Sequence, residues 1–317
     1  MKIQKFNYHI FVNIFRIFIF LITCGCANYN VRHVHDAQLV RALAYRGDPE
    51  GAAELGVFYS TGHGVPQNME IAVEWFHKAA DLGNAKGLYN LGLCYARGDG
   101  VPKNDVRAFE CWSKAAVLEH ADAQYLLGWS YMYGKGVAKD MAKAVEWLSK
   151  AAEKGNADAQ YLLSLCYAMD DGVTKDMAKA VEWLSKAAKL EHADAQYLLG
   201  GSYMYGEGVA KDMAKAVEWL SKAAEQGKTD AQVDLGLCYA MDDGVNKDMA
   251  KAVEYWSKAA EKGNADAQYL LGKCYENGEG VVKDMAKAVE WLSKAAAQGN
   301  AEAIKYLQEL LKELNKK

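Results

Sequence analysis

A repeat of 36 residues runs through most of the chain and constrains its fold more than any other feature. Tyrosine recurs at this interval from Tyr59 to Tyr275, and an Ala-Ala pair recurs from 79–80 to 295–296. A Leu-Gly pair keeps the same step, with Ser164 replacing the glycine once among Gly56, Gly92, Gly128, Gly200, Gly236 and Gly272. A fixed period of this length is typical of stacked repeat architectures. Seven units in register leave no room for a separate domain between 47 and 298.

Each unit is predicted to form two helices, here called helix A and helix B, joined by a glycine turn. In the third unit an apolar side chain recurs every four residues over 121–133, which gives helix A one buried stripe, Ala123, Leu127 and Tyr131. After the turn at 134–137, Asp140 is the expected N-cap of helix B. Gly155 ends helix B in the left-handed conformation that glycine adopts most easily. We expect the buried side of helix B to comprise Ala144, Val145, Trp147, Leu148, Ala151 and Ala152.

The two ends of the repeat region are predicted to differ from its middle. Residues 27–46 form a leader with an N-terminal helix over 36–46. Residues 299–317 begin like another helix A but lack a glycine turn and become polar. Terminal repeats need a polar outer face to stay soluble. The sequence therefore predicts an all-α solenoid of seven repeats closed by a C-terminal capping helix.

Residues 1–26 have the composition of an export signal. Basic residues precede an uncharged apolar run at 17–23, which ends at Cys24-Gly25-Cys26-Ala27. This pattern resembles a bacterial lipoprotein signal, with the lipid on Cys26 or, alternatively, on Cys24. The resemblance implies a membrane-anchored lipoprotein, in the outer membrane if the cell has two membranes. An ordinary cleaved signal, giving a periplasmic or secreted protein, and an uncleaved anchor are the alternatives.

The repeat motif closely resembles the Sel1-like repeat family, relatives of tetratricopeptide repeats with a unit two residues longer. The motif reads Ala-Asp-Ala-Gln-Tyr-Leu-Leu-Gly, then Tyr, then Gly-x-Gly-Val-x-Lys-Asp, then Lys-Ala-Val-Glu-Trp-Leu-x-Lys-Ala-Ala-x-x-Gly, and it covers about 47–317. The resemblance implies an α/α right-handed superhelical solenoid that acts as a protein-interaction scaffold or adaptor. Exported bacterial members of the family often mediate contacts at the envelope or with a host cell. A fold does not determine a partner, however.

Helix A carries a second apolar face, which we predict lines a concave groove for a protein or peptide. Its residues lie at i, i+3 and i+7, away from the core stripe. They are Leu126, Trp129 and Tyr133, then Leu162, Leu165 and Met169, then Leu198 and Tyr205, and then Leu237 and Met241. Large exposed apolar patches mark interaction sites, and methionine adapts to varied partners. The alternative is that neighbouring A helices bury this stripe against one another.

The sequence favours no cofactor, metal or nucleic acid. The formal net charge is −4 and no half is basic, so nucleic acid has no electrostatic footprint. The Gly-x-Gly segments follow a helix and lack the lysine spacing of a phosphate loop, so we interpret them as turns. Asp170 and Asp242 replace the first glycine of two turns, and aspartate tolerates the left-handed conformation.

Four cysteines share one position of helix A, namely Cys94, Cys166, Cys238 and Cys274. Copies one repeat apart are expected at a helix-packing distance of about 8–10 Å. A disulfide needs Cα atoms within about 7 Å. We therefore expect free, buried thiols at this position, and a pairing of Cys94 with Cys111 stays open.

Catalysis is the competing interpretation. Some cysteine-rich Sel1-like proteins are associated with β-lactam hydrolysis or binding, so the alternative is a β-lactam-hydrolysing or cell-wall-associated enzyme, or an enzyme accessory. A serine acylase of that kind needs Ser-x-x-Lys. Here tyrosine follows three residues after Ser130, Ser164 and Ser202. We therefore predict no catalytic residue, and a membrane contact only through the N-terminal signal or its lipid.

Overall fold

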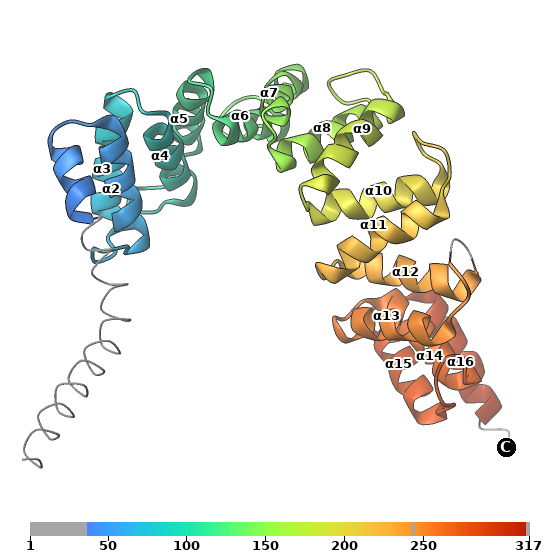
Figure 1. The fold of residues 1–317 in the computed structure, drawn as a ribbon. Coiled ribbons are helices and arrows are strands. Elements are labelled where there is room, and N and C mark those ends of the chain that lie inside the picture. The colour runs from blue at the N-terminus through green and yellow to red at the C-terminus, as the bar shows by residue number, and fades with distance from the viewer. Residues whose placement is uncertain (1–36, 243–244, 315–317) are drawn as a thin grey trace, which may run out of the picture. The chain divides into compact units, whose positions relative to one another are not determined.

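The computed structural model describes residues 37–242 and 245–314, and the regular structure within these ranges is α-helical (Figure 1). Helices A and B alternate along the chain in seven tandem repeats, which confirms the all-α solenoid. The A helices are α2 (Pro49–Thr61), α4 (Ala85–Arg97), α6 (Ala121–Tyr133), α8 (Ala157–Met169), α10 (Ala193–Tyr205), α12 (Thr229–Met241), α14 (Ala265–Asn277) and α16 (Ala301–Leu314). The B helices are α3 (Met69–Asp81), α5 (Asp105–Val117), α7 (Met141–Glu153), α9 (Met177–Lys189), α11 (Met213–Glu225), α13 (Met249–Glu261) and α15 (Met285–Ala297).

The chain divides into two compact units, with the boundary between Lys150 and Ala151. In the first unit a helix over 37–45 precedes α2, close to the predicted leading helix. In the second, α16 follows the last repeat. The predicted signal with Cys24 and Cys26 lies outside the described residues.

Capping residues set the helix boundaries. Helix α6 spans 121–133 as predicted, and Gly134 ends it at φ 68°. Asp140 is the N-cap of α7, because its Oδ1 accepts the Lys143 N–H at 3.0 Å. Asp170 ends α8 at φ 60°, as expected of an aspartate that replaces the turn glycine. Its Oδ1 also accepts the Lys175 N–H at 2.8 Å, which stabilises that turn.

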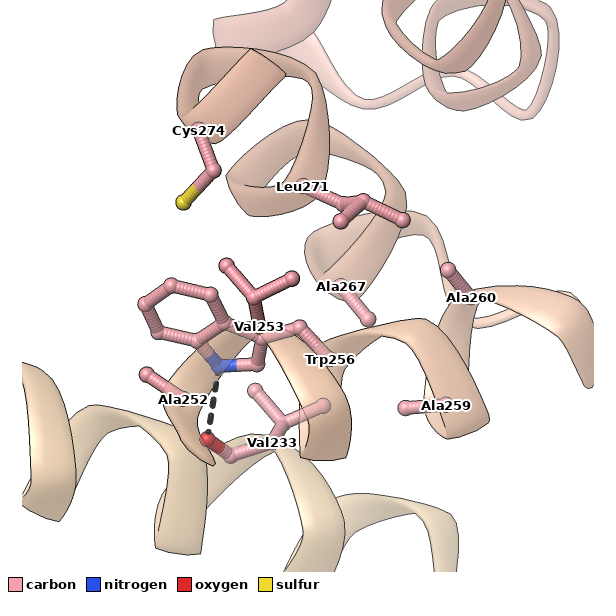
Figure 2. Packing of buried hydrophobic residues seen from close by; sticks show 9 residues of the cluster. All are labelled: Val233, Ala252, Val253, Trp256, Ala259, Ala260, Ala267, Leu271 and Cys274. Atoms are coloured by element: carbon pink, nitrogen blue, oxygen red, sulfur yellow. Dashed lines mark hydrogen bonds between the residues drawn. The ribbon is translucent and has the colours of Figure 1, made fainter. Parts of the chain in front are cut away.

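In six of the seven repeats, helix B packs closely on the glycine of the Leu-Gly pair, and Ser164 takes this place in the fourth repeat. Figure 2 shows this core at α12, α13 and α14, where the Trp256 Nε1–H donates to the Val233 carbonyl at 3.1 Å. A Cβ on Gly236 would collide with that same Nε1. Only a residue without a side chain admits the tryptophan here, because protein cores are too densely packed to move aside. The repeated glycine therefore allows helix B to contact the backbone of helix A.

The second glycine of the Gly-x-Gly turn joins one repeat to the repeat before it. At Gly208 a Cβ would overlap the Met177 carbonyl oxygen at the start of α9, and φ is +70°. Gly136 in the first unit has the same relation to Asp105 of α5. The turn therefore needs glycine for its conformation and also for its contact with the preceding repeat.

A buried glutamine in five of the A helices, α6, α8, α10, α12 and α14, donates a hydrogen bond to the end of the helix B before it. The Nε2 of Gln196 donates to the Ala188 carbonyl at 3.1 Å, and Gln160 does the same to Ala152 at 3.0 Å. The last carbonyls of a helix have no partner within it. The glutamine supplies one, so the motif Ala-Asp-Ala-Gln links consecutive helices through a hydrogen bond.

The structure corrects one prediction about the buried side of helix B. Ala144, Leu148 and Ala151 are buried there, but the Trp147 ring is only half-buried. The Lys150 Nζ lies 4.0 Å from the centroid of that ring, and Lys150 pairs with Glu146 at 2.8 Å. The cation covers the outer face of the indole, a contact that stabilises an aromatic ring at a surface. Trp147 therefore bridges the core and the exposed face.

Candidate partner-binding surface

In the first unit, the exposure of the predicted groove residues increases along α6. Leu126 and Trp129 are half-buried, whereas Tyr133 at the end of the helix is 55% exposed. The rings of Trp129 and Tyr133 lie 5.2 Å apart between centroids. These two aromatic side chains form one apolar surface in the third repeat.

The second unit repeats this gradient on three A helices. Leu165, Leu198 and Leu237 are half-buried. The residues at the ends of the helices are more exposed, at 67% for Met169, 71% for Tyr205 and 66% for Met241. Leu162 differs, because it is buried, with only 9% of its surface exposed. Its side chain offers a partner little surface, so the accessible part of the stripe begins at Leu165.

A hollow of about 420 Å³ opens between these helices of the second unit. Its lining comes from α8, α9, α10 and α12 and is mostly apolar, with Leu165, Val181 and Leu198 among the walls. Gly201 lies in the lining, and a Cβ at this glycine would meet no atom within 4 Å. The volume therefore follows in part from a missing side chain.

Asp234 brings a carboxylate to this hollow, where the equivalent residue of the preceding repeat is Leu198. Burial raises the pKa of Asp234. The hydrogen bond that its carboxylate accepts from the Tyr197 hydroxyl opposes this shift, and the negative charge of Asp230 raises the pKa further. Burial, and then the charges of Asp234 and Asp230, raise the pKa of Tyr197 to about 12. Tyr197 is therefore a hydrogen-bond donor at neutral pH.

The sequence prediction omitted the two residues that give the hollow its character. Gly201 and Asp234 both interrupt an otherwise apolar stripe, so neither belongs to a list chosen for apolar side chains. In the sequence, Gly201 and Asp234 are visible only as two departures from the repeat pattern, 33 residues apart. They come together only because α10 and α12 both line one hollow.

The cysteines of the described part of the chain carry thiols with little nucleophilic character. Cys94 and Cys111 are both free thiols, so they do not pair with each other, and Cys166 and Cys274 are free as well. Burial raises the pKa of each of these four thiols to about 11. The thiolate is the reactive form, and such thiols are protonated at neutral pH. Cys238 is buried at the same helix A position.

The histidines of the inter-repeat turns serve the fold. His192 is the N-cap of α10, and its Nδ1 accepts the Ala195 N–H at 3.2 Å. Its ring stacks on Tyr161 with 4.6 Å between centroids. Within 37–242 and 245–314 no group of three His, Cys, Asp or Glu side chains is placed to hold a metal ion. The helices of these same ranges are each too short or too polar to cross a bilayer.

Comparison with known proteins gives consistent matches. The Sel1 repeat family model matches seven times, over 49–84, 85–119, 121–156, 157–192, 193–228, 229–264 and 265–300. A similar solved structure is c5321, a protective antigen of uropathogenic Escherichia coli that displays an SLR fold, with 35% identity and a TM-score of 0.83. That match covers 86% of this chain, which spans 59% of the antigen's length.

A Sel1 repeat protein from Oxalobacter formigenes is also 35% identical, with a TM-score of 0.67. The match covers 86% of this chain and 79% of that protein. No curated protein sequence matches the chain.

Proposed function

This chain belongs to the Sel1 repeat family, and we propose that it is an exported adaptor that binds a protein or peptide along its helix A face. Sel1 repeat proteins are generally protein-interaction scaffolds, and their fold is typically non-catalytic. We propose further that the protein lies in the bacterial envelope and that it contacts a host.

One observation carries the choice of face. Met169, Tyr205 and Met241 occupy the same position in three successive A helices, and each is about two-thirds exposed. Monomeric soluble proteins rarely gather exposed apolar side chains on one face, and such a face marks an interaction site. The outer face of helix B contrasts with this, because Glu–Lys pairs such as Glu218–Lys222, at 2.7 Å, repeat along it.

Site-specific photo-crosslinking in the native cell tests the binding face. A photoreactive amino acid would replace Met169, Tyr205 or Met241, and matched controls would replace Glu182, Glu218 or Glu254, which are exposed on the B helices of the same repeats. We expect one adduct of the same mass from the three helix A positions and none from the controls. Equal adducts from both sets, or none from either, would contradict the proposed face.

The proposed location is the bacterial envelope, with a lipid on Cys26 or Cys24 as the anchor. A basic start, an apolar run and small residues at 24–27 support export. Without the lipid the protein would be periplasmic or secreted. The protective antigen among its structural relatives supports a position from which a protein can meet a host.

Labelling with a palmitate analogue tests the anchor. We expect label on the wild-type protein, its loss from Cys26→Ala and its retention by Cys24→Ala. Loss from Cys24→Ala alone would move the lipid to Cys24. Wild-type protein that carries no label would exclude a lipid anchor and leave an ordinary cleaved signal or an uncleaved anchor.

A further inference from the structure

Two stretches of the chain, 119–153 and 191–225, are identical at all but two positions. The differences are Trp129 against Gly201 and Lys135 against Glu207. In the second stretch both residues line the 420 Å³ hollow. In the first, Trp129 and Lys135 line a smaller cavity of about 160 Å³. Both differences therefore lie in the lining of equivalent cavities. Gly201 removes the large side chain of Trp129, and Glu207 reverses the charge of Lys135.

The removal of the side chain at 201 is not required by packing. The neighbouring Gly200 is required, because a Cβ there would lie 2.8 Å from the Leu220 Cγ. At Gly201 the same atom would meet open space. A glycine within a helix costs about 1 kcal/mol relative to alanine. This glycine therefore lowers helix stability and provides volume.

The charge at this place is not compensated within the described residues. Asp234 accepts a hydrogen bond from Tyr197, but neither Asp234 nor Glu207 forms an ion pair with a described side chain. Lys228 has its Nζ 5.9 Å from the centroid of the Tyr197 ring, and it pairs with Asp194 instead. A half-buried carboxylate is stabilised when an opposite charge comes near it. The hollow therefore combines apolar walls with two carboxylates, those of Asp234 and Glu207, that can attract a positive charge.

We propose that this hollow binds a basic side chain of the protein partner, and that arginine fits it best. The aliphatic part of the side chain would lie on Leu165 and Leu198, and the guanidinium would reach Asp234 and Glu207. Arginine buries its stem on apolar surface while its planar head forms paired hydrogen bonds to carboxylates. The exposed ring of Tyr205 at the same hollow adds a face on which a guanidinium can stack.

Other occupants meet fewer of these features. An anion would be repelled by both carboxylates, and a neutral apolar group would bury the charge of Asp234 without an opposite charge beside it, which costs free energy. A metal ion such as calcium needs six to eight oxygen ligands. The inference rests on the proposed function, because it names the chemistry that the helix A face would recognise in its partner.

Titration of the purified protein with two model peptides tests the inference. The probes are acetyl-Gly-Leu-Arg-Leu-Gly-amide and the same peptide with citrulline, which keeps the shape of arginine and lacks its charge. The readout is the NMR signal of the Met177 methyl group, which lines the hollow. We expect the arginine peptide to shift this signal and to bind about tenfold more tightly than the citrulline peptide, the size of effect that one charged hydrogen bond gives.

Two variants make the test specific. Asp234→Asn keeps the side chain's shape and should abolish the preference for arginine. The double variant Gly201→Trp with Glu207→Lys installs the residues of the other copy, which the same fold accepts at 129 and 135, and should abolish binding of both peptides. Equal binding of the two peptides to the wild type, no binding at millimolar concentration, or an unchanged preference in Asp234→Asn would overturn the inference.

The outcome for the hollow can be separated from the outcome for the proposed function. Crosslinks from Met169 and Met241 report the binding face whatever the charge of the ligand. If those crosslinks form and the arginine preference is absent, the adaptor function stands and the basic side chain is excluded. If the crosslinks fail as well, both are contradicted.

Discussion

The copies at 119–153 and 191–225 separate what the fold requires from what it leaves free. Both keep the glycine under helix B, at 128 and 200, and the turn glycine that contacts the preceding repeat, at 136 and 208. Both keep the glutamine that bonds to the preceding helix B, Gln124 to Ala116 at 3.2 Å and Gln196 to Ala188 at 3.1 Å. Each shared residue is fixed by a close contact or a buried hydrogen bond.

The two positions that differ have no such constraint. Trp129 is half-buried beside Tyr133, and Gly201 faces open space. Positions 135 and 207 lie in the exposed part of the turn. In an array whose repeats contact only their neighbours, such positions can change without disturbing the stack. The surface of one repeat can therefore be adapted to a ligand while its core stays the same.

The largest expected effect is at the shared turn glycine. Gly208→Ala and Gly136→Ala should each lower the free energy of unfolding by about 3 kcal/mol, because the new Cβ overlaps a backbone carbonyl and the residue keeps a positive φ. Urea unfolding followed by circular dichroism measures the loss. The control is Gly263→Ala, where φ is +92° and the space is open, with an expected loss of about 1 kcal/mol. Equal losses at Gly208 and Gly263 would show that conformation alone requires the glycine.

Local features of the fold could be predicted from the sequence. The bounds of α6, the cap at Asp140 and the left-handed Asp170 follow from periodicity and turn chemistry within a few residues. The contact of Gly208 with Met177 and the reach of Gln196 to Ala188 could not, because they join different helices. A recurring glycine or glutamine marks a constrained position without naming the atom that constrains it.

The candidate surface could be predicted only in outline. An apolar stripe on helix A predicts which side chains share a face, and Met169 and Tyr205 are indeed exposed. The exposure of each leucine depends on its neighbours, so the burial of Leu162 could not be read from spacing. The hollow is harder to predict from the sequence, because it combines the missing side chain at Gly201 in α10 with the carboxylate of Asp234 in α12.

Two adjacent glycines should respond in opposite directions to the same change. Gly200→Ala places a Cβ 2.8 Å from the Leu220 Cγ and should cost about 2 kcal/mol of unfolding free energy. Gly201→Ala meets no atom within 4 Å and should add about 1 kcal/mol, the difference in helix propensity. Thermal unfolding of the two variants beside the wild type gives the ranking. A loss of stability in Gly201→Ala would mean that the fold requires the hollow.

The smallest expected effect concerns Asp234, where the preceding repeats have Leu162 and Leu198. Asp234→Leu should raise the free energy of unfolding by about 1 kcal/mol at pH 7, because the half-buried carboxylate is replaced by an apolar side chain. Burial raises the pKa of Asp234 in the folded protein above its unfolded value, so folding favours the protonated form. The carboxylate's cost is therefore present above the folded pKa and disappears as the pH falls below the unfolded value.

Urea unfolding of the wild type and of Asp234→Leu at pH 7 and pH 4 measures this effect as the difference in unfolding free energy between the two proteins. The contributions of the other carboxylates cancel in that difference. The gain should be larger at pH 7 than at pH 4. Asp234→Asn is the control, since it retains a polar group beside Tyr197 and does not titrate. A gain that is the same at both pH values would show that the charge of Asp234 is not what lowers stability here.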